Sequence, residues 1–549
     1  PIVLAPMSAA YDLADGVAPG LGDVGVMLPS APLHHLLVRG AEVYVATSGN
    51  LAGEPLRYRN AEALADLGGV VDAFLLHDRP IHVPVEDSVL LADAAPPHRS
   101  PESWGPAGTA SRQTGPLADA APSLPIRRSR GYAPLPIMLG EADAAVLAVG
   151  GELKNTFAVT RDGMAFLSAH IGDMESPLAQ SALTRSVEQM SAIHGRVPEL
   201  VVADLHPDYA VTRWAERYCE ARDLPLIQVQ HHQAHALSLL AEHGLGPEIR
   251  ACVATFDGVG YGLDGHIWGG EILVLGGTAD PLSFERAWHL DEYWLPGGDA
   301  ASFAPWKCAV ALLDQFSLDG AGLPPFAAAP QPELNVLRQL PAAAAAGLPG
   351  LIHHTTSAGR LFDAVASILA VRHRVTYEAQ AAMELERLAR DCVHPDCAAW
   401  RADPLGPAGP AAALSGPAAP ARLPGGRVGA RAQPPSAISP VRMLLAATVA
   451  GLQNGVDRAC LARRFHSTLA GITATALVRA ADQAGAEVLG LTGGVFQNRL
   501  LTRATLDALA PDGRPVLTHR LVPAGDGGLA LGQARAGYTL LTWNPEQGR

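Results

Sequence analysis

The feature that most constrains the fold is an order of predicted elements that occurs twice along the chain. In its first occurrence, short apolar runs separated by turn residues predict an antiparallel meander, and helical periodicity then alternates with further strand-like runs. The predicted strands span residues 144–149, 156–160, 164–168, 200–203 and 226–230, and the predicted helices span 181–193, 209–222 and 231–243. The order of elements is therefore β-β-β-α-β-α-β-α.

The same order begins again at Arg250, with helical inserts between its members. The second set of strands is predicted at 251–256, 266–275, 284–290, 486–492 and 515–518, and its last helices near 498–510 and 527–536. This doubled unit is the topology of the actin, sugar-kinase and Hsp70-like ATPases, which hold a nucleotide between their two halves. We therefore expect an α/β protein with a nucleotide cleft between lobe I, residues 143–249, and lobe II, residues 250–549.

Length and composition limit the number of domains and the classes of function. A chain of 549 residues exceeds the size of one hydrophobic core, so at least two domains are expected. No apolar run approaches the roughly 20 residues that cross a bilayer, and no signal peptide is present, so we expect a cytoplasmic protein without a membrane partner. The net charge of −14 disfavours nucleic acid as a partner. The six cysteines lack C-x-x-C spacing, which favours reduced thiols over a zinc finger or a disulfide framework.

Two stretches have the composition of segments that do not fold. Residues 97–125 and 398–440 are rich in Pro, Ala and Gly and poor in large apolar side chains. Such segments cannot bury enough apolar surface to offset the entropy lost when the backbone is ordered. We predict a flexible insertion at 97–125 and a disordered insertion at 398–440.

Two histidines and two aspartates form a candidate metal site. His231 and His235 are four residues apart on a predicted helix, so both imidazoles project from one face. Asp257 ends the first strand of the second unit and Asp526 lies at the start of the last helix, positions that the doubled topology brings to the cleft. Imidazole favours Fe, Zn or Mn and carboxylate favours Mg, so the metal identity stays open. Ordinary turn, cap or core hydrogen bonding is the alternative interpretation of each residue.

Three glycine-containing loops are candidates for contact with phosphate. Glycine lets a phosphate approach backbone N–H groups closely, and two of the loops lie between a strand and the next element. The candidate nucleotide-binding residues of these loops are Gly258, Gly297, Gly298, Gly493, Gly494 and Asn498. Glycine-rich turns are common, so each loop taken alone is also compatible with a turn that binds no ligand.

A second group of candidate nucleotide-binding residues lies in the first 140 residues. Thr47, Ser48 and Asn50 follow a predicted β-branched strand at 43–45 and offer hydroxyl and amide groups to a phosphate or a carbonyl. Arg130 lies in an arginine-rich run, residues 127–132, whose charge would attract a triphosphate. A solvated basic surface is the alternative interpretation of that run.

Motifs over nearly the whole chain resemble those of the HypF carbamoyltransferase family. Residues 1–140 resemble the C-terminal part of a YrdC-like domain, and residues from about 143 onward resemble the TsaD-like domain of that family. The resemblance rests on residues 28–29, 32–37, 47–50, 76–81, 150–156, 170–173, 204–209, 231–235, 268–271, 357–364 and 493–498. The acylphosphatase domain and the paired C-x-x-C zinc modules of the family are missing, so we expect an N-terminally truncated member.

The resemblance implies an ATP-dependent carbamoyltransferase of nickel–iron hydrogenase maturation. In that family, ATP and carbamoyl phosphate give carbamoyl-adenylate in the YrdC-like domain, and the TsaD-like domain passes the carbamoyl group to the C-terminal cysteine of HypE. ATP and a divalent metal would be the cofactors. Carried onto this chain, the metal ligands would be His231, His235, Asp257 and Asp526, the nucleotide would lie at Gly493, Gly494 and Asn498, and the adenylate at Thr47, Ser48, Asn50 and Arg130. Lys154, near the phosphates, and His232 are the predicted catalytic residues.

Other functions stay open at this point. An enzyme alternative carbamoylates a small-molecule hydroxyl or transfers threonylcarbamoyl to tRNA, although the acidic charge and the motifs at 204–209 and 357–364 favour the HypF type. A binding alternative holds nucleotide and HypE without turnover, because the opening, cation-bearing part of the YrdC-like domain is missing from the sequence.

Overall fold

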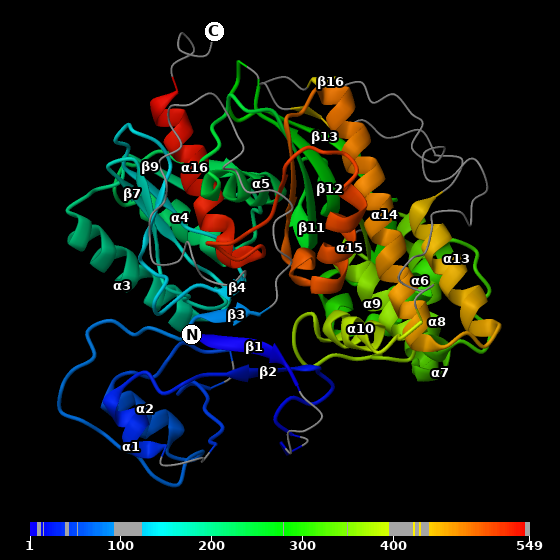
Figure 1. The fold of residues 1–549 in the computed structure, drawn as a ribbon, viewed down its shortest axis with the longest axis horizontal. Helices are drawn as coiled ribbons and strands as arrows, with labels where there is room; N and C mark the ends of the chain where they lie inside the picture. Colours follow the sequence, from blue (N-terminus) through cyan, green and yellow to red (C-terminus); the bar gives the residue numbers. More distant parts are fainter. Residues whose placement is uncertain are drawn as a thin grey trace.

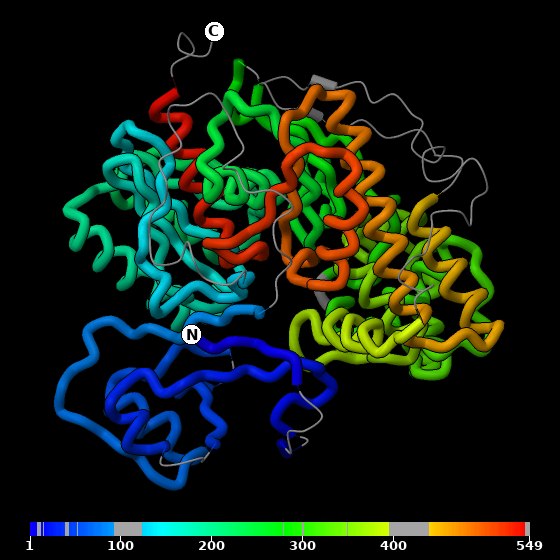
Figure 2. The backbone as a smooth tube through the Cα atoms, in the orientation of Figure 1, coloured from blue at the N-terminus to red at the C-terminus, as the bar shows by residue number. Residues whose placement is uncertain are grey.

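The computed structural model describes residues 1–7, 13–14, 16–38, 43–51, 53–92, 123–277, 279–348, 350–394, 421–422, 428–429 and 439–543. Figure 1 shows a smaller body, made by the first residues, below two larger lobes that lie side by side. Figure 2 shows that the chain builds the left lobe, then the right lobe, and returns to the left lobe with its last helix, in red. No helix among the described residues is long and apolar enough to span a bilayer.

The sheet of lobe I reproduces the first predicted unit. Strands β6, β7 and β8 form an antiparallel meander, and β9 and β10 extend the sheet in parallel on the side of β6. One more strand, β5, precedes residue 143 and pairs antiparallel with β8. The elements are β5 (Pro136–Met138), β6 (Val146–Ala148), β7 (Ala158–Arg161), β8 (Met164–Leu167), α3 (Pro177–His194), β9 (Leu200–Asp204), α4 (Ala210–Glu220), β10 (Leu226–Val229) and α5 (His231–Glu242).

The sheet of lobe II has the same plan. Strands β11, β12 and β13 form the meander, and β18 and β19 extend it in parallel on the side of β11. Both lobes therefore place five equivalent strands in the same spatial order, which confirms the predicted two-lobed α/β fold. The strands are β11 (Ala251–Tyr261), β12 (Ile267–Leu275), β13 (Phe284–His289), β14 (Tyr293–Pro296), β15 (Ile352–Thr355), β18 (Val488–Thr492) and β19 (Val516–Leu517).

The helices of lobe II cover its sheet and connect its strands. A continuous apolar core joins them to the sheet, with Phe256 of β11 and Leu477 of α14 among its buried members. The elements are η2 (Gly298–Phe303), α6 (Pro305–Gln315), α7 (Pro324–Ala328), α8 (Gln331–Ala345), α9 (Ala358–Ile368), α10 (Gln380–Arg390), α13 (Pro440–Gln453), α14 (Arg458–Ala484), η4 (Gly494–Gln497), α15 (Arg499–Leu509) and η5 (Asp526–Gly528). The last helix, α16 (Leu529–Thr542), packs instead on the sheet of lobe I and on α5.

Helix α5 lies between the two sheets and against α16, and this packing positions the site. All residues of α5 are buried, and one apolar cluster combines its Leu239 with Val146 of lobe I and Val253 of lobe II. The backbones of α5 and α16 touch at Gly532, where an added Cβ would lie 1.8 Å from the carbonyl oxygen of Ala234. Only glycine permits that approach, so this residue fixes the distance between the two helices.

The first region has a four-stranded sheet in the order β2-β1-β3-β4. Its elements are β1 (Ile2–Pro6), β2 (Asp23–Val26), α1 (Pro32–Leu37), α2 (Asn60–Leu67), β3 (Val89–Leu91) and β4 (Leu124–Arg127). The predicted strand at 43–45 was wrong, because these residues have no strand conformation and their side chains are exposed. β-Branched side chains indicate a strand only where the segment joins a sheet, and the described sheet of this region, β2-β1-β3-β4, does not include 43–45.

The two predicted insertions fall mostly outside the described residues. The described residues at their C-terminal ends belong to regular elements, so both insertions were predicted too long there. Leu124 and Pro125 belong to β4, which pairs antiparallel with β3, and Pro440 begins α13, whose N-cap is Ser439. Within the second stretch, β16 (Ala421–Arg422) and β17 (Val428–Gly429) pair antiparallel.

Asp23 forms ion pairs that join the first region to lobe II. Asp23 of β2 accepts hydrogen bonds from Arg390 at the end of α10, at 2.8 Å, and from Arg499 at the start of α15, at 2.6 Å. Arg499 also donates to the carbonyl oxygen of Ala92. Burial raises the pKa of Asp23, but the two guanidinium groups outweigh this effect and lower it, so the aspartate is ionised at neutral pH. We call Asp23, Arg390 and Arg499 the junction.

Candidate metal and nucleotide site

Four side chains from three separated segments meet at the first turn of α5. His231 and His235 come from that turn, Asp257 from β11 and Asp526 from η5. One ligand atom from each residue can be chosen so that all four lie within 4.8 Å of one another. The two histidines are each 1% exposed. The structure therefore brings together the four residues predicted as metal ligands, which we call the ligand cluster.

Asp257 connects the histidines to the glycine turns. Its Oδ1 accepts hydrogen bonds from the backbone N–H groups of Gly258, at 2.8 Å, and Gly494, at 3.3 Å. Its Oδ2 lies 2.9 Å from Nε2 of His235 and 3.4 Å from Nε2 of His231. Both oxygens of this carboxylate are thus held in place by neighbours from β11, α5 and η4.

Asp526, at the start of η5, faces the same two histidines. Its Oδ1 lies 3.7 Å from Nε2 of His231 and 3.8 Å from Nε2 of His235, too far for a hydrogen bond. Burial raises the pKa of Asp526 to about 7; His231 opposes that rise and Asp257 adds to it. Burial and the Asp257 carboxylate thus outweigh the positive charge of His231 and favour a proton on Asp526.

Asp204 orients His231 from behind. This buried aspartate ends β9, and its Oδ2 lies 2.7 Å from Nδ1 of His231. Nδ1 therefore donates to Asp204, which directs Nε2 toward Asp257 and Asp526. A carboxylate that holds the outer nitrogen of a histidine is the usual support of a metal-binding imidazole. Asp204 was not among the predicted site residues.

The residues of the ligand cluster differ in their protonation states. Burial lowers the pKa of His231, but Asp204, Asp257 and Asp526 outweigh burial and raise it well above the usual value. Burial lowers the pKa of His235, with Asp257 opposing only in part. Burial raises the pKa of Asp257, but the two histidines outweigh it and hold this pKa well below the usual range. At neutral pH, His231 therefore carries a proton, His235 is neutral and Asp257 is ionised.

These residues fit a divalent cation. Nε2 of His231 is buried and has no hydrogen-bond partner, although it faces two carboxylates. Two imidazole nitrogens with two carboxylate oxygens suit Zn, Fe or Mn, and ligands of this kind bind the metal in their deprotonated forms. A cation would take the place of the proton on His231 and of the proton on Asp526. The ligand cluster is therefore a candidate metal centre.

The turn after β18 passes directly over β11. Gly493 has φ +96°, and an added Cβ would lie 2.2 Å from the carbonyl oxygen of Phe256. At Gly494 an added Cβ would lie 2.8 Å from Oδ1 of Asp257. Both positions require glycine, because a side chain would collide with the strand or with the ligand cluster. The predicted residues Gly258, Gly493 and Gly494 thus surround Asp257.

Both the oxygen and the nitrogen of the Asn498 side-chain amide form hydrogen bonds. Its Oδ1 caps α15 by accepting from Leu501 N–H, and its Nδ2 lies 3.0 Å from Nε2 of His466. Burial lowers the pKa of His466 to about 4, and its Nδ1 donates to the carbonyl oxygen of Ala462, so the ring is neutral and Nε2 accepts from Asn498. The predicted nucleotide role of Asn498 would therefore use a side chain that the fold has already oriented.

Lys154 belongs to lobe I, and its side chain contacts lobe II. Its ammonium group forms an ion pair with Glu378, and its backbone N–H donates to Asp173. Burial lowers the pKa of Lys154, but Glu378, Asp526 and Asp257 outweigh it and raise the pKa. The carboxylates of the ligand cluster therefore act on Lys154, and its predicted catalytic role near the phosphates stays a prediction. The loop before it is also close, because an added Cβ on Gly151 would lie 3.5 Å from Oδ2 of Asp526.

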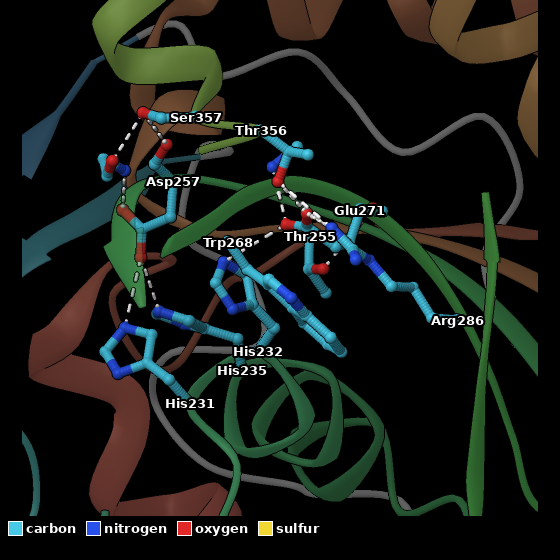
Figure 3. Close-up of polar contacts among 12 residues, drawn as sticks. His231, His232, His235, Thr255, Asp257, Trp268, Glu271, Arg286, Thr356 and Ser357 are labelled. Atoms are coloured by element: carbon cyan, nitrogen blue, oxygen red, sulfur yellow. Dashed lines mark hydrogen bonds and ion pairs between the residues drawn. The ribbon is translucent and has the colours of Figure 1, made fainter. Parts of the chain in front are cut away.

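A second polar group lies behind the histidine helix, and Figure 3 shows it beside the ligand cluster. Nε2 of His232 lies 3.5 Å from Oε2 of Glu271, and both side chains are fully buried. Arg286 donates to Glu271 at 2.8 Å and to Thr356 at 3.2 Å, and its guanidinium carbon lies 4.0 Å from the ring centroid of Trp268. His232, predicted as catalytic, thus faces this group rather than the four ligands, and its catalytic role stays a prediction.

Ser357 joins this second group to Asp257. It follows Thr356, whose hydroxyl also donates to Glu271. The hydroxyl of Ser357 donates to the carbonyl oxygen of Gly258, lies 3.5 Å from that of Asp257, and caps α9 (Figure 3). The backbone on both sides of the Asp257 carboxylate is therefore held by the turn between β15 and α9.

Sequence reasoning missed the supporting residues of the site. Asp204, Glu271 and Ser357 lie in three of the motifs that carry the family resemblance, yet no local pattern assigns them a role. Asp204 ends β9, which lies parallel to β10, the strand that leads into α5. This position at the end of a neighbouring parallel strand is the sequence signal that could have indicated a role beside His231. Glu271 lies in the interior of a strand, where a charged residue is buried only with partners.

The remaining predicted nucleotide residues lie elsewhere. Gly297 and Gly298 follow β14, an edge strand separated from β11 by β15 and β12. In the first region, the Asn50 amide donates to the carbonyl oxygens of Leu51 and Glu54, closing its own turn. Arg130 lies beside Asp87 and donates to Val85. Thr47 and Ser48 lie before Asn50 in a segment without regular secondary structure. The nucleotide contacts of all these residues stay predictions.

Comparison with known proteins agrees with this architecture. Residues 253–533 match the family described as carbamoyltransferase, Kae1-like domain, second subdomain; residues 141–242 match the HypF Kae1-like domain; residues 1–99 match the Sua5/YciO/YrdC family, described as telomere recombination. The first two families correspond to lobe II and lobe I. The third covers most of the first region.

Individual relatives agree with the family matches. Carbamoyltransferase HypF2 of Cupriavidus necator is 36% identical over 97% of this chain, which spans 63% of the relative. A carbamoyltransferase HypF homolog of the same organism is 35% identical over 72% of this chain and 92% of its own length. The crystal structure of a full-length HypF in its phosphate- and nucleotide-bound form superposes with a TM-score of 0.77 at 31% identity, over 99% of this chain and 63% of that one. The chain thus spans less than two thirds of the length of the longer relatives. It belongs to the HypF carbamoyltransferase family.

Proposed function

We propose that this chain is an ATP-dependent carbamoyltransferase of nickel–iron hydrogenase maturation, which transfers a carbamoyl group from carbamoyl-adenylate to the C-terminal cysteine of HypE. The single observation that carries the proposal is the ligand cluster of His231, His235, Asp257 and Asp526 beside the glycine turns, in a chain of the HypF family. The solved HypF in its phosphate- and nucleotide-bound form supports nucleotide binding by a chain of this family.

The reaction joins the carbamoyl carbon to sulfur and breaks the bond between that carbon and the phosphate of the adenylate. The thiolate is the nucleophile, and AMP leaves with the electron pair. The ammonium of Lys154 is the group of this chain that would hold the phosphate, because the N–H groups of Gly258 and Gly494 already donate to Asp257. A divalent cation on the ligand cluster would neutralise charge on the phosphate and polarise the carbonyl.

The fold supplies rigidity and protection from water. Asp204 behind His231, and Ser357 behind Asp257, hold the ligands in orientation before any substrate binds. The full burial of α5 keeps bulk water from the histidines, which would limit hydrolysis of the adenylate. Lys154 must leave Glu378 to contact a phosphate, so we infer that nucleotide binding breaks that ion pair.

The direct test measures the acceptor protein. The purified chain is mixed with ATP, carbamoyl phosphate and HypE, and HypE is weighed by mass spectrometry for an added carbamoyl group; a HypE variant without its C-terminal cysteine is the control. A second arm supplies carbamoyl-adenylate directly. Addition in the second arm alone would show that transfer occurs without adenylate formation, and no addition in either arm, with a longer HypF active beside it, would contradict the transferase.

The His235→Ala variant ties transfer to the ligand cluster. Removing this imidazole takes away one of the four predicted ligands and the side chain closest to Asp257, so we expect bound metal and carbamoyl transfer to be lost together. Loss of a ligand should weaken metal binding by more than the roughly 10–100-fold cost of losing an outer partner. His266→Ala is the matched control, because His266 pairs with Glu292 at the surface. Retention of metal and transfer in His235→Ala would remove the metal assignment.

A second candidate is nucleotide and HypE binding without turnover. It is favoured by the first region, where, among the described residues, the Asn50 side chain contacts only its own turn and Arg130 contacts only other residues of this region, Val85 and Asp87 among them. Isothermal titration with a non-hydrolysable ATP analogue distinguishes the candidates. Binding of the analogue without carbamoylation of HypE in either arm would support this second function.

A further inference from the structure

Two cysteines that are distant in sequence meet in lobe II. Cys392 and Cys460 are separated by 68 positions, but their Sγ atoms lie 3.3 Å apart. Cys392 follows the end of α10, and Cys460 lies in the first turn of α14. The Cys460 side chain is 5% exposed, whereas Cys392 is partly exposed. The sequence predicts scattered, reduced thiols and no pair, so this contact is a product of the tertiary fold.

We propose that Cys392 and Cys460 form a reversible intramolecular disulfide, which joins α10 to α14 when the protein meets a small-molecule disulfide oxidant. The thiolate of Cys392 attacks one sulfur of the oxidant and releases one small thiol. The thiolate of Cys460 then attacks Sγ of Cys392 and releases the second thiol. Two protein thiols thus lose two protons and two electrons, and the oxidant is reduced to two thiols.

The geometry and the exposure of the two residues support this order of steps. A disulfide needs its sulfurs at about 2.05 Å, so the two Sγ atoms must move together by roughly one ångström, which side-chain rotation allows. Cys392 is the thiol that an oxidant can reach, and Cys460 is close enough to attack before a second oxidant molecule arrives. The mixed disulfide on Cys392 is therefore an intermediate and not the product.

The other described cysteines do not compete. Cys219, Cys252 and Cys308 are buried in apolar surroundings. Burial raises the pKa of Cys252 and of Cys308 to about 12, so neither forms a thiolate near neutral pH. Cys397 lies outside the described residues and is near Cys392 in sequence, so the experiment must separate it from the pair.

The disulfide would act on the turn at Asn498. From α10, Glu386 accepts a hydrogen bond from the backbone N–H of Leu500, at 3.3 Å. From α14, His466 accepts from Asn498. The two helices that the disulfide links are therefore the two supports of this turn, and Arg390 of the junction also belongs to α10. The oxidised protein should hold the Asn498 turn more rigidly than the reduced protein.

Peptide mapping tests the proposal on the full chain. The native protein is treated with oxidised glutathione, its remaining thiols are alkylated, and it is digested without reduction for mass spectrometry. We expect a linked peptide containing Cys392 and Cys460 and the loss of two alkylatable thiols, both reversed by a reductant. The link should persist in Cys397→Ser and disappear in Cys392→Ser, a substitution at a partly exposed position that should not affect folding.

Two results would overturn the proposal. One is alkylation of both Cys392 and Cys460 after oxidation, or recovery of Cys392 only as its glutathione adduct or its link to Cys397. The other concerns the Asn498 turn and uses hydrogen exchange. Oxidation should slow exchange in α10 and in the first turn of α15, with no change in Cys392→Ser; equal exchange in the oxidised and reduced protein would contradict the coupling.

Discussion

The two lobes and the first region differ in how far their large apolar side chains are buried. In the lobes, Phe157, Phe256 and Trp306 are 0% exposed and lie in continuous cores. In the first region, Leu28 and Val45 are 78% and 81% exposed. Burying one large apolar side chain stabilises a fold by roughly 1.5–3 kcal/mol. The lobes therefore supply the stability that holds the ligand cluster, and the first region gains much less from its own contacts.

Polar side chains differ between the two regions in the same way. In the lobes, buried polar groups from distant segments meet, as Asp204 meets His231 and Glu271 meets Arg286. In the first region, among the residues that the structure describes, the side chain of the predicted nucleotide residue Asn50 contacts only its own turn. Single substitutions at polar positions should therefore affect the lobes strongly and the first region weakly.

The largest expected effect compares two arginines. Arg286→Met removes the partner of the fully buried Glu271, and breaking a buried ion pair in this way costs about 3–5 kcal/mol of unfolding free energy. Arg57→Met in the first region removes a pair with Glu54 and Asp66, whose carboxylates are about a third exposed, and should cost under about 1 kcal/mol. Urea unfolding followed by circular dichroism measures both. Equal losses would remove the contrast between the regions.

Asp204→Asn should weaken metal binding without unfolding the chain. The amide keeps the shape of the carboxylate but no longer supports the charge on His231. Outer-sphere carboxylates of this kind contribute roughly 10–100-fold to metal affinity. Competition with a coloured chelator measures the affinity, and Asp66→Asn in the first region is the control. An unchanged affinity would mean that Asp204 does not orient His231 for a metal.

Metal affinity should depend on pH through Asp526. Its pKa of about 7 means that a proton on Asp526 competes with the cation, so affinity should rise as the pH rises toward 7. His231, whose pKa is raised well above the usual value, holds a second competing proton, so the affinity should continue to rise above pH 7. In the metal-free protein, the contribution of Asp526 to the free energy of unfolding changes with pH in the opposite direction. Folding holds a proton that the unfolded chain releases, so this group's contribution to stability falls as pH rises from about 4 to about 7. Asp526→Asn should flatten both profiles, which chelator competition and urea unfolding measure.

The smallest expected effect concerns the junction between the regions. Asp23→Asn removes the charge that Arg390 and Arg499 share, and partly exposed pairs of this kind contribute about 1 kcal/mol or less. Unfolding of the lobes should therefore hardly change. Limited proteolysis should nevertheless cleave the first region faster than in the unaltered protein. Unchanged cleavage would show that other contacts hold the first region in place.

Most of the fold was predictable, because local periodicity reflects local backbone geometry. The two β-β-β-α-β-α-β-α units appear with their strands within a few residues of the predicted positions, apart from the extension of β11 to Tyr261. The strand expected at 43–45 failed, because β-branched composition indicates strand conformation only where a neighbouring strand completes the hydrogen bonds. The ligand cluster was predictable in part, since helical spacing pairs His231 with His235 and the doubled topology brings in Asp257 and Asp526.

By itself, the sequence determined the order of elements, the doubling of the unit and the placement of two imidazoles on one helix face. Each of these depends on the backbone periods of 3.6 and 2 residues, which act over short distances. Only the tertiary structure decided that His232 faces Glu271 while its neighbours face Asp257, that the pKa of Asp526 rises to about 7, and that Cys392 meets Cys460. Those outcomes depend on which buried groups from distant segments come within a few ångströms, and that is set by packing.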